Sequence, residues 1–150
     1  MKNYPFILVL LLLIHSVSLA KETTTEEVIR GIISCKNDRT YCLSKTERSG
    51  DIIYIYSEME VRIGDFNPEE IPNYAKIMLG LTTEIKKSID STIASVGLKE
   101  KTALFTKNQI NDIYIYAFRG NEDKGVVWID KNLSDQEIKN KVIEYGYMVD

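Results

Sequence analysis

The chain has 150 residues, with 19 basic against 22 acidic residues and a formal net charge of −3. The charges are spread along the chain without a block of one sign. This distribution argues against nucleic acid as a partner, because phosphate binding needs a concentrated basic patch. No interior segment has the composition of a linker, and the length suits one domain with a single core.

The first twenty residues have the pattern of a secretory signal peptide. Lys2 supplies the positive start, residues 6–14 form an unbroken apolar run, and Ser18 and Ala20 are small residues before a cleavage point. The alternative is an uncleaved membrane anchor, which needs about 20 apolar residues. We predict a signal peptide over 1–20, a disordered lead-in over 21–25 and a single domain over 26–150.

Cleavage after Ala20 would also remove the only histidine, His15, and would leave 18 basic against 22 acidic residues, a net charge of −4. The mature chain would then have no histidine base, no histidine metal ligand and no nucleophile that depends on histidine. Its glycines are isolated, so no phosphate-binding loop is present. We therefore predict no cofactor, no metal and no catalytic residue.

Two cysteines, Cys35 and Cys42, flank a polar, turn-like segment. In an oxidising compartment such a pair is expected to form a disulfide. A loop this short gains roughly 2–3 kcal/mol from loop-closure entropy. Two free thiols are the alternative, whereas zinc fits poorly because a structural site needs four nitrogen or sulfur ligands.

The first half of the expected domain reads mainly as strands. We interpret Glu26 to Ser34 as a strand leading to Cys35, although its start also fits a helical turn. Residues 41–44 are expected to form the strand that returns after this turn. Two more strands are expected: residues 51–56 are rich in β-branched and aromatic residues, and residues 58–63 alternate between apolar and charged positions.

A long helix is expected next. Asn67-Pro68 is typical of a helix start, and Pro72 separates a short first turn from a main helix beginning near Asn73. Apolar residues then recur at steps of three and four until Gly97, which predicts a helix of about 24 residues, or about 36 Å.

The second half contains three further strand patterns and one more helix. The strands are expected at 102–106, 112–118 and 126–130, and the helix begins at a capping box from Ser134 to Glu137. The oxygen-rich residues 130–135 fit calcium poorly, because Asp135 stands where a calcium loop needs glycine. The predicted fold is α+β: an antiparallel sheet of about five or six strands with one long and one short helix.

Two segments resemble one another within the chain. Residues 51–56 (DIIYIY) and 112–116 (DIYIY) are each followed by Val-x-Ile and then by an acid and isoleucine at a helix start. A duplicated ββα unit would give two helices on one side of the sheet. Convergence is the alternative, because many strands reuse isoleucine and tyrosine.

In both repeated segments the isoleucines face one way and the tyrosines face the other. Tyr54, Tyr56, Tyr114 and Tyr116 are therefore expected on one face of the sheet. Tyrosine is favoured at protein interfaces, so these four residues are the candidate binding residues. The alternative is that a loop or the N-terminal segment covers them.

Carboxylates are the remaining candidates for catalysis. Glu58, Glu60 and Asp65 are close in sequence, and a glycosidase needs two carboxyl groups about 5–10 Å apart. Glu58 and Glu60 lie beside Arg62 on the polar face of a predicted strand, which is typical of a solvated surface.

The sequence therefore favours a small exported protein, periplasmic or secreted, that binds another protein through a sheet face. An inhibitor or immunity-type protein fits a small, disulfide-bonded chain without catalytic groups. No nucleic acid and no transmembrane anchor are expected in the mature chain. The alternatives are a carboxylate-dependent hydrolase of cell-wall or polysaccharide substrates, and an assembly module of an envelope complex.

Overall fold

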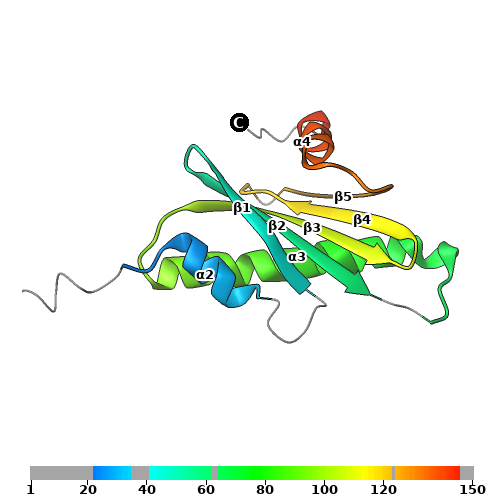
Figure 1. Ribbon diagram of the computed structural model, residues 1–150, viewed down its shortest axis with the longest axis horizontal. Coiled ribbons are helices and arrows are strands. Elements are labelled where there is room, and N and C mark those ends of the chain that lie inside the picture. Colours follow the sequence, from blue (N-terminus) through cyan, green and yellow to red (C-terminus); the bar gives the residue numbers. More distant parts are fainter. Residues whose placement is uncertain (1–21, 35–40, 62–63, 123, 146–150) are drawn as a thin grey trace, which may run out of the picture.

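A computed structural model describes residues 22–34, 41–61, 64–122 and 124–145 (Figure 1). The expected signal peptide and Cys35 lie outside the described residues. The elements are α2 (Thr25–Ile32), β1 (Tyr41–Ser49), β2 (Ile52–Val61), η1 (Pro68–Glu70), α3 (Ile71–Ser95), β3 (Lys101–Ile110), β4 (Ile113–Arg119), β5 (Gly125–Asp130) and α4 (Asp135–Glu144).

The strands of the described residues form one sheet in the order β1-β2-β3-β4-β5. Pairing is antiparallel except between β2 and β3, which are parallel from Ile52–Lys101 to Val61–Ile110. The fold class α+β is confirmed, but the predicted antiparallel sheet is wrong because the sheet is mixed. The reason is the length of α3: its 25 residues span about 37 Å, close to the roughly 33 Å of a ten-residue strand. The helix therefore carries the chain back to the end where β2 began, and β3 runs parallel to β2.

Strand β2 corrects a second expectation. The predicted separate strands at 51–56 and 58–63 share one continuous strand from Ile52 to Val61. It enters from β1 through a tight turn at Gly50, whose φ of +59° suits glycine. The alternation predicted for residues 51–56 holds within it, with Ile53 and Ile55 on one face and Tyr54 and Tyr56 on the other.

The N-terminal segment is a helix rather than the strand we favoured. Thr24 caps α2 through a capping box with Glu27, and Val28 and Ile29 are buried. The apolar positions 28, 29, 32 and 33 recur at the spacing of a helix face, and this outweighs the β-propensity of their branched side chains. The N-cap of this helix, Thr24, lies inside the expected lead-in over residues 21–25.

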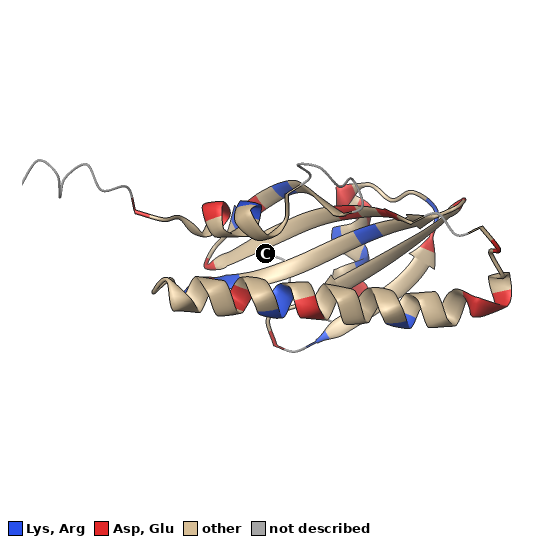
Figure 2. Cartoon of the chain, turned by 90° about the horizontal axis from the view of Figure 1, so that it is seen from below, with Lys and Arg blue, Asp and Glu red and all other residues tan. Residues whose placement is uncertain are grey.

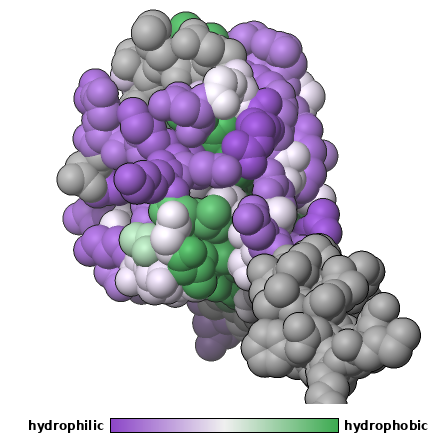
Figure 3. Space-filling model, turned by 90° about the vertical axis from the view of Figure 1, so that its left-hand side faces the viewer, coloured by the Kyte–Doolittle hydropathy of each residue, from purple (hydrophilic) through white to green (hydrophobic). Residues whose placement is uncertain are grey.

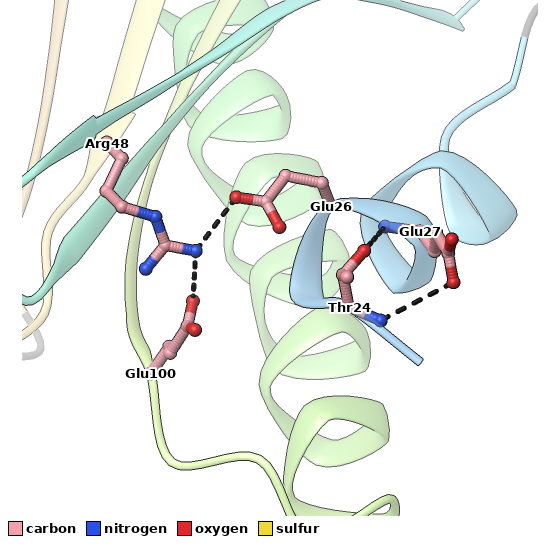
Figure 4. A network of polar contacts seen from close by, with 5 residues as sticks. All are labelled: Thr24, Glu26, Glu27, Arg48 and Glu100. Carbon is pink, nitrogen blue, oxygen red and sulfur yellow. Dashed lines mark hydrogen bonds and ion pairs between the residues drawn. The ribbon is translucent and has the colours of Figure 1, made fainter. Parts of the chain in front are cut away.

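Helix α2 is tied to the sheet by one arginine. The guanidinium of Arg48 on β1 lies 2.8 Å from Glu26 on α2 and 2.9 Å from Glu100, just before β3 (Figure 4). The apolar side of α2 packs with α3 against β2 and β3, in a core that includes Ile29, Ile55 and Ile89.

Helix α4 covers the opposite face of the sheet (Figure 1). Its buried Ile138 and Val142 pack against an aromatic core on that face. The predicted arrangement of two helices on one side is therefore wrong: α2 and α3 lie on one face and α4 lies on the other. The two similar ββ segments consequently do not build equivalent ββα units.

Charged residues are distributed around this framework. Basic and acidic positions are interspersed along α3 in Figure 2. None of the described helices combines the length and the apolar character needed to span a membrane.

Candidate functional site

The four candidate tyrosines share one face of the sheet, as the alternation predicted. Tyr54 and Tyr56 come from β2, and Tyr114 and Tyr116 come from β4. However, Tyr54, Tyr56 and Tyr116 are only 3%, 5% and 2% exposed, and Tyr114 is half-buried. An exposed binding surface made of all four side chains is therefore absent, because α4 lies over this face.

Between the two pairs of tyrosines lies Phe105 of β3. Its ring stacks on Tyr56 with centroids 4.8 Å apart, and Phe118 lies 4.7 Å from it on the other side. Tyr116 in turn stacks on Trp128 of β5. The result is a row of aromatic rings across the sheet, of which sequence reasoning identified only the tyrosines.

Two adjoining hollows lie on this face of the sheet, and the first is lined partly by α4. The first, here called the α4 cavity, has a volume of about 250 Å³ and is lined by Lys45, Tyr56, Phe105, Tyr116, Asp135 and Ile138, among others. The second, here called the open hollow, has a volume of about 410 Å³, and its lining includes Glu60, Gln109 and Tyr114. Both are also lined by Glu58 and Lys107, so together they form one surface, the sheet-face groove.

The Tyr56 hydroxyl is the most unusual group of the α4 cavity. It is buried and has no hydrogen-bond partner among the described residues. Burial raises the pKa of Tyr56 well above its usual value, and the nearby charges of Glu47 and Asp135 raise it further. The hydroxyl is therefore protonated at physiological pH, and its oxygen has almost no accessible surface.

Tyr116, on the same face, provides a contrast. Its hydroxyl accepts a hydrogen bond from the backbone N–H of Leu133 at 2.6 Å and donates one to the carbonyl of Lys131 at 3.1 Å. Tyr116 thus holds the segment before α4 in place. Its hydroxyl is fully used in the fold, whereas that of Tyr56 is not.

Two ion pairs connect β1 to α4 beside Tyr56. Lys45 pairs with Asp135, and its ammonium lies 4.8 Å from the centre of the Tyr56 ring. Lys139 pairs with Glu47 at 2.7 Å. The Asp135 carboxylate raises the pKa of Lys45, so Lys45 stays charged. These contacts place charge at the rim of an aromatic cavity.

Lys107 likewise places a positive charge beside a tyrosine ring, here in the open hollow. Its ammonium lies 4.9 Å from the centre of the Tyr114 ring and donates a hydrogen bond to the side-chain oxygen of Asn132. Glu58, which lines both hollows, is exposed and makes no ion pair with a described residue. The groove therefore combines aromatic rings with charges of both signs.

Glu58, Glu60 and Cys42 lie along the sheet-face groove. Glu58 and Asp135 both line the α4 cavity, and Glu58 and Glu60 both line the open hollow. Within the described part of the chain, no group of three or more His, Cys, Asp and Glu side chains could hold a metal ion. Cys42 lies in β1 and lines the open hollow, whereas its expected partner Cys35 lies outside the described residues, so the disulfide stays a prediction.

Exposed apolar side chains are dispersed rather than gathered on one surface. Figure 3 shows one small apolar patch, enclosed on most sides by polar residues. The large exposed apolar residues of the described chain are spread over α3, β5 and the C-terminal helix region: Ile77, Leu81, Val96, Ile129, Ile143 and Tyr145.

Comparison of this chain with protein-family models, with curated proteins and with solved structures found no match. Its function therefore has to be inferred from the chemistry of the sheet-face groove.

Proposed function

We propose that this chain is an exported binding protein, periplasmic or secreted, that holds a segment of another protein in the sheet-face groove. The observation that carries the proposal is the composition of the groove: an aromatic floor with charges of both signs at its rim. Aromatic residues at a centre surrounded by polar groups are typical of protein interfaces.

The charges indicate what the bound segment should carry. Lys45 is paired with Asp135, and Lys107 is bonded to Asn132, so both cations already have partners. Glu58 lies between the two hollows without an ion-pair partner among the described residues. A segment with a basic residue opposite Glu58 therefore fits the groove best.

The hydrolase alternative would use Glu58 and Asp135 of the α4 cavity. A carboxyl group that acts as general acid must be held protonated, usually by an apolar environment. The Asp135 side chain instead is 52% exposed and is paired with the ammonium of Lys45, so it lacks such an environment. The pair thus suits binding better than acid catalysis.

The assembly-module alternative predicts a large apolar surface or an unusually exposed strand edge. The dispersed apolar residues on α3, β5 and α4 supply no single such surface within the described chain. A groove with specific polar groups supports recognition of one partner more directly.

A charge exchange in the groove tests the proposal. The double variant Glu58→Lys, Lys107→Glu keeps the net charge but inverts the local pattern of the groove. Immobilised wild-type protein is expected to retain a partner from an envelope extract, and the variant is expected to lose at least nine-tenths of it. The retained protein is identified and quantified by mass spectrometry.

The matched control is Glu84→Lys, Lys87→Glu on the exposed side of α3. These residues form a weak ion pair of 3.8 Å, so the exchange is chemically the same but lies away from the groove. The control should retain the partner fully. Equal retention by both double variants, or retention of no protein by the wild type, would contradict the proposed function.

Export makes a separate prediction about the covalent structure. Protein purified from the producing cell is expected to begin at Lys21 and to be lighter by two hydrogen atoms than the reduced chain, because Cys35 and Cys42 are joined. Intact-mass measurement with and without a reductant checks both points. A mass that includes the first twenty residues would argue against export as an ordinary secretory protein.

A further inference from the structure

The two edges of the sheet, β1 and β5, differ in how they are protected from pairing with another strand. An uncovered edge offers unpaired backbone groups, and proteins commonly block it with charged side chains or a bulge. Strand β1 has both, because it carries Lys45, Glu47 and Arg48 and its register shifts between Leu43 and Lys45. Strand β5 has the sequence Gly-Val-Val-Trp-Ile-Asp, with a charge only at its last residue. The edge at β5 is therefore the one suited to strand pairing.

The pairing of β5 with β4 decides which backbone groups of β5 point outward. The Gly120 N–H donates a hydrogen bond to the Lys124 carbonyl at 2.8 Å, just before β5 begins. Hydrogen-bonded pairs of an antiparallel ladder recur at every second residue, so the even-numbered residues of β5 bond to β4. The N–H and carbonyl groups of Gly125, Val127 and Ile129 therefore point away from β4, and no described strand lies beyond β5 to receive them.

A second copy of β5, running antiparallel about Val127, can pair with all of these groups. Val127 then lies opposite Val127 of the second copy, and Gly125 lies opposite Ile129 of the second copy. Every outward N–H of β5 meets an outward carbonyl in this register. A shift by two residues in either direction leaves one outward residue of each strand without its counterpart.

The side chains agree with the same register. Lys124 lies opposite Asp130 of the second copy, and opposite charges on directly facing residues stabilise a strand pair. On the other face of the sheet Ile129, which is 44% exposed, lies opposite Gly125 of the second copy, which has no side chain to collide with it. The Leu79 side chain comes within 3.0 Å of the position that a Cβ of Gly125 would occupy, so Ile129 also gains an apolar neighbour.

We propose that two copies of this chain pair antiparallel through β5, about a two-fold axis at Val127, and form one continuous sheet. Strand β1 then lies at both outer edges, where its charges and bulge oppose further strand addition, so association ends at the dimer. The axis is perpendicular to the sheet, so both sheet-face grooves lie on the same side of the dimer. This inference goes beyond the proposed function and does not depend on it.

Sedimentation velocity of the purified processed protein tests the dimer. A single pair of short strands buries little surface, so the dimer is expected to be weak. The measurement therefore covers concentrations from about 0.01 to about 1 mM, which bracket a dissociation constant on the order of 0.1 mM. The mass should rise from one chain to two over this range and should not rise further.

The variant Ile129→Pro tests the backbone pairing. Proline has no N–H, and because the N–H of residue 129 points outward, the pairing with β4 is kept. The dissociation constant of the dimer should rise at least about tenfold, while the melting temperature stays within about 5 °C of the wild type. The matched control is Ile129→Thr, which is also less apolar but keeps the N–H and should weaken the dimer less than about threefold.

Two charge variants test the register and leave the backbone of β5 unchanged. Lys124→Asp and Asp130→Lys each place like charges opposite one another in their own dimer, so each should dimerise about tenfold more weakly than the wild type. An equimolar mixture of the two variants places opposite charges at both positions. The mixture should therefore form a heterodimer with an affinity within about threefold of the wild type.

Three results would overturn the inference: a single-chain mass at every concentration, equal weakening by Ile129→Pro and Ile129→Thr, or a mixture of the charge variants that associates no better than each alone. The charge exchange at Glu58 and Lys107 lies away from β5, so the two sets of measurements can fail separately. Loss of the partner in that exchange, with a wild type that stays monomeric, would leave the proposed function standing and remove the dimer. A dimer that behaves as expected, with full retention of the partner by that exchange, would leave the β5 pairing standing and remove the groove.

Discussion

Replacing Val142 by aspartate is expected to detach α4 from the sheet while the rest of the domain stays folded. Val142 is 0% exposed and packs with Ile138 into the aromatic core. Burying an unpaired carboxylate there would cost several kcal/mol. A helix of ten residues adds little stability by itself. Releasing α4 therefore costs less free energy than unfolding the whole core.

Trp128, the single tryptophan, reports this event directly. It is buried on the α4 face, stacked between Tyr116 and Tyr145, and its fluorescence should shift to the red when α4 is released. The core between the sheet and helices α2 and α3 is separate, so far-UV circular dichroism should lose only a small part of its helical signal.

The neighbouring residue supplies the control. Ile143→Asp makes the same chemical change at a side chain that is 54% exposed, and it should alter stability by no more than about 0.5 kcal/mol. Unchanged Trp128 fluorescence in Val142→Asp, or loss of all structure in a single transition under native conditions, would contradict the independence of α4.

Asp90→Ala is expected to cause the second large effect, a loss of about 2 kcal/mol in the free energy of unfolding. Lys86 lies on the sheet side of α3 and is 7% exposed. Its ammonium lies 2.5 Å from Asp90, which also accepts a hydrogen bond from Thr102. Removing Asp90 leaves a buried cation and a hydroxyl unpaired. Because the Asp90 side chain is 41% exposed, solvent reduces the roughly 3–5 kcal/mol expected for a fully buried pair.

Urea denaturation checks this prediction, and a second substitution tests its cause. Adding Lys86→Met to Asp90→Ala removes the buried cation and should return stability to within about 1 kcal/mol of the wild type. Glu84→Ala breaks the exposed pair with Lys87 and should cost less than about 0.5 kcal/mol. A loss as large in the double variant as in Asp90→Ala would mean that the unpaired ammonium is not the cause.

Several features could be predicted because their causes are local. The capping box at Ser134 begins α4, since its hydrogen bonds join residues three apart. The alternation of isoleucine and tyrosine placed the four tyrosines on one face, because successive side chains of a strand point to opposite sides. These rules depend only on neighbours along the chain.

Other features could not be read in this way. The segment at Val28 and Ile29 has both β-branched residues and helical spacing, and packing against Ile89 and Ile93 of α3 decides between them. A capping box at Thr24 was the signal that could have identified this helix. Whether a face is exposed depends on α4, which reaches it from more than 70 residues further along the chain than β2.

The sequence by itself determined the elements of the second half, the two faces of its strands and the lack of histidine after residue 15. Tertiary structure alone decided the parallel pairing of β2 with β3, the side of the sheet on which each helix lies, and the burial of Tyr56. The physical reason is the distance along the chain over which each interaction acts. Strand alternation and helix caps depend on residues a few positions apart. Burial instead depends on which distant segment buries the most apolar surface by covering a given face.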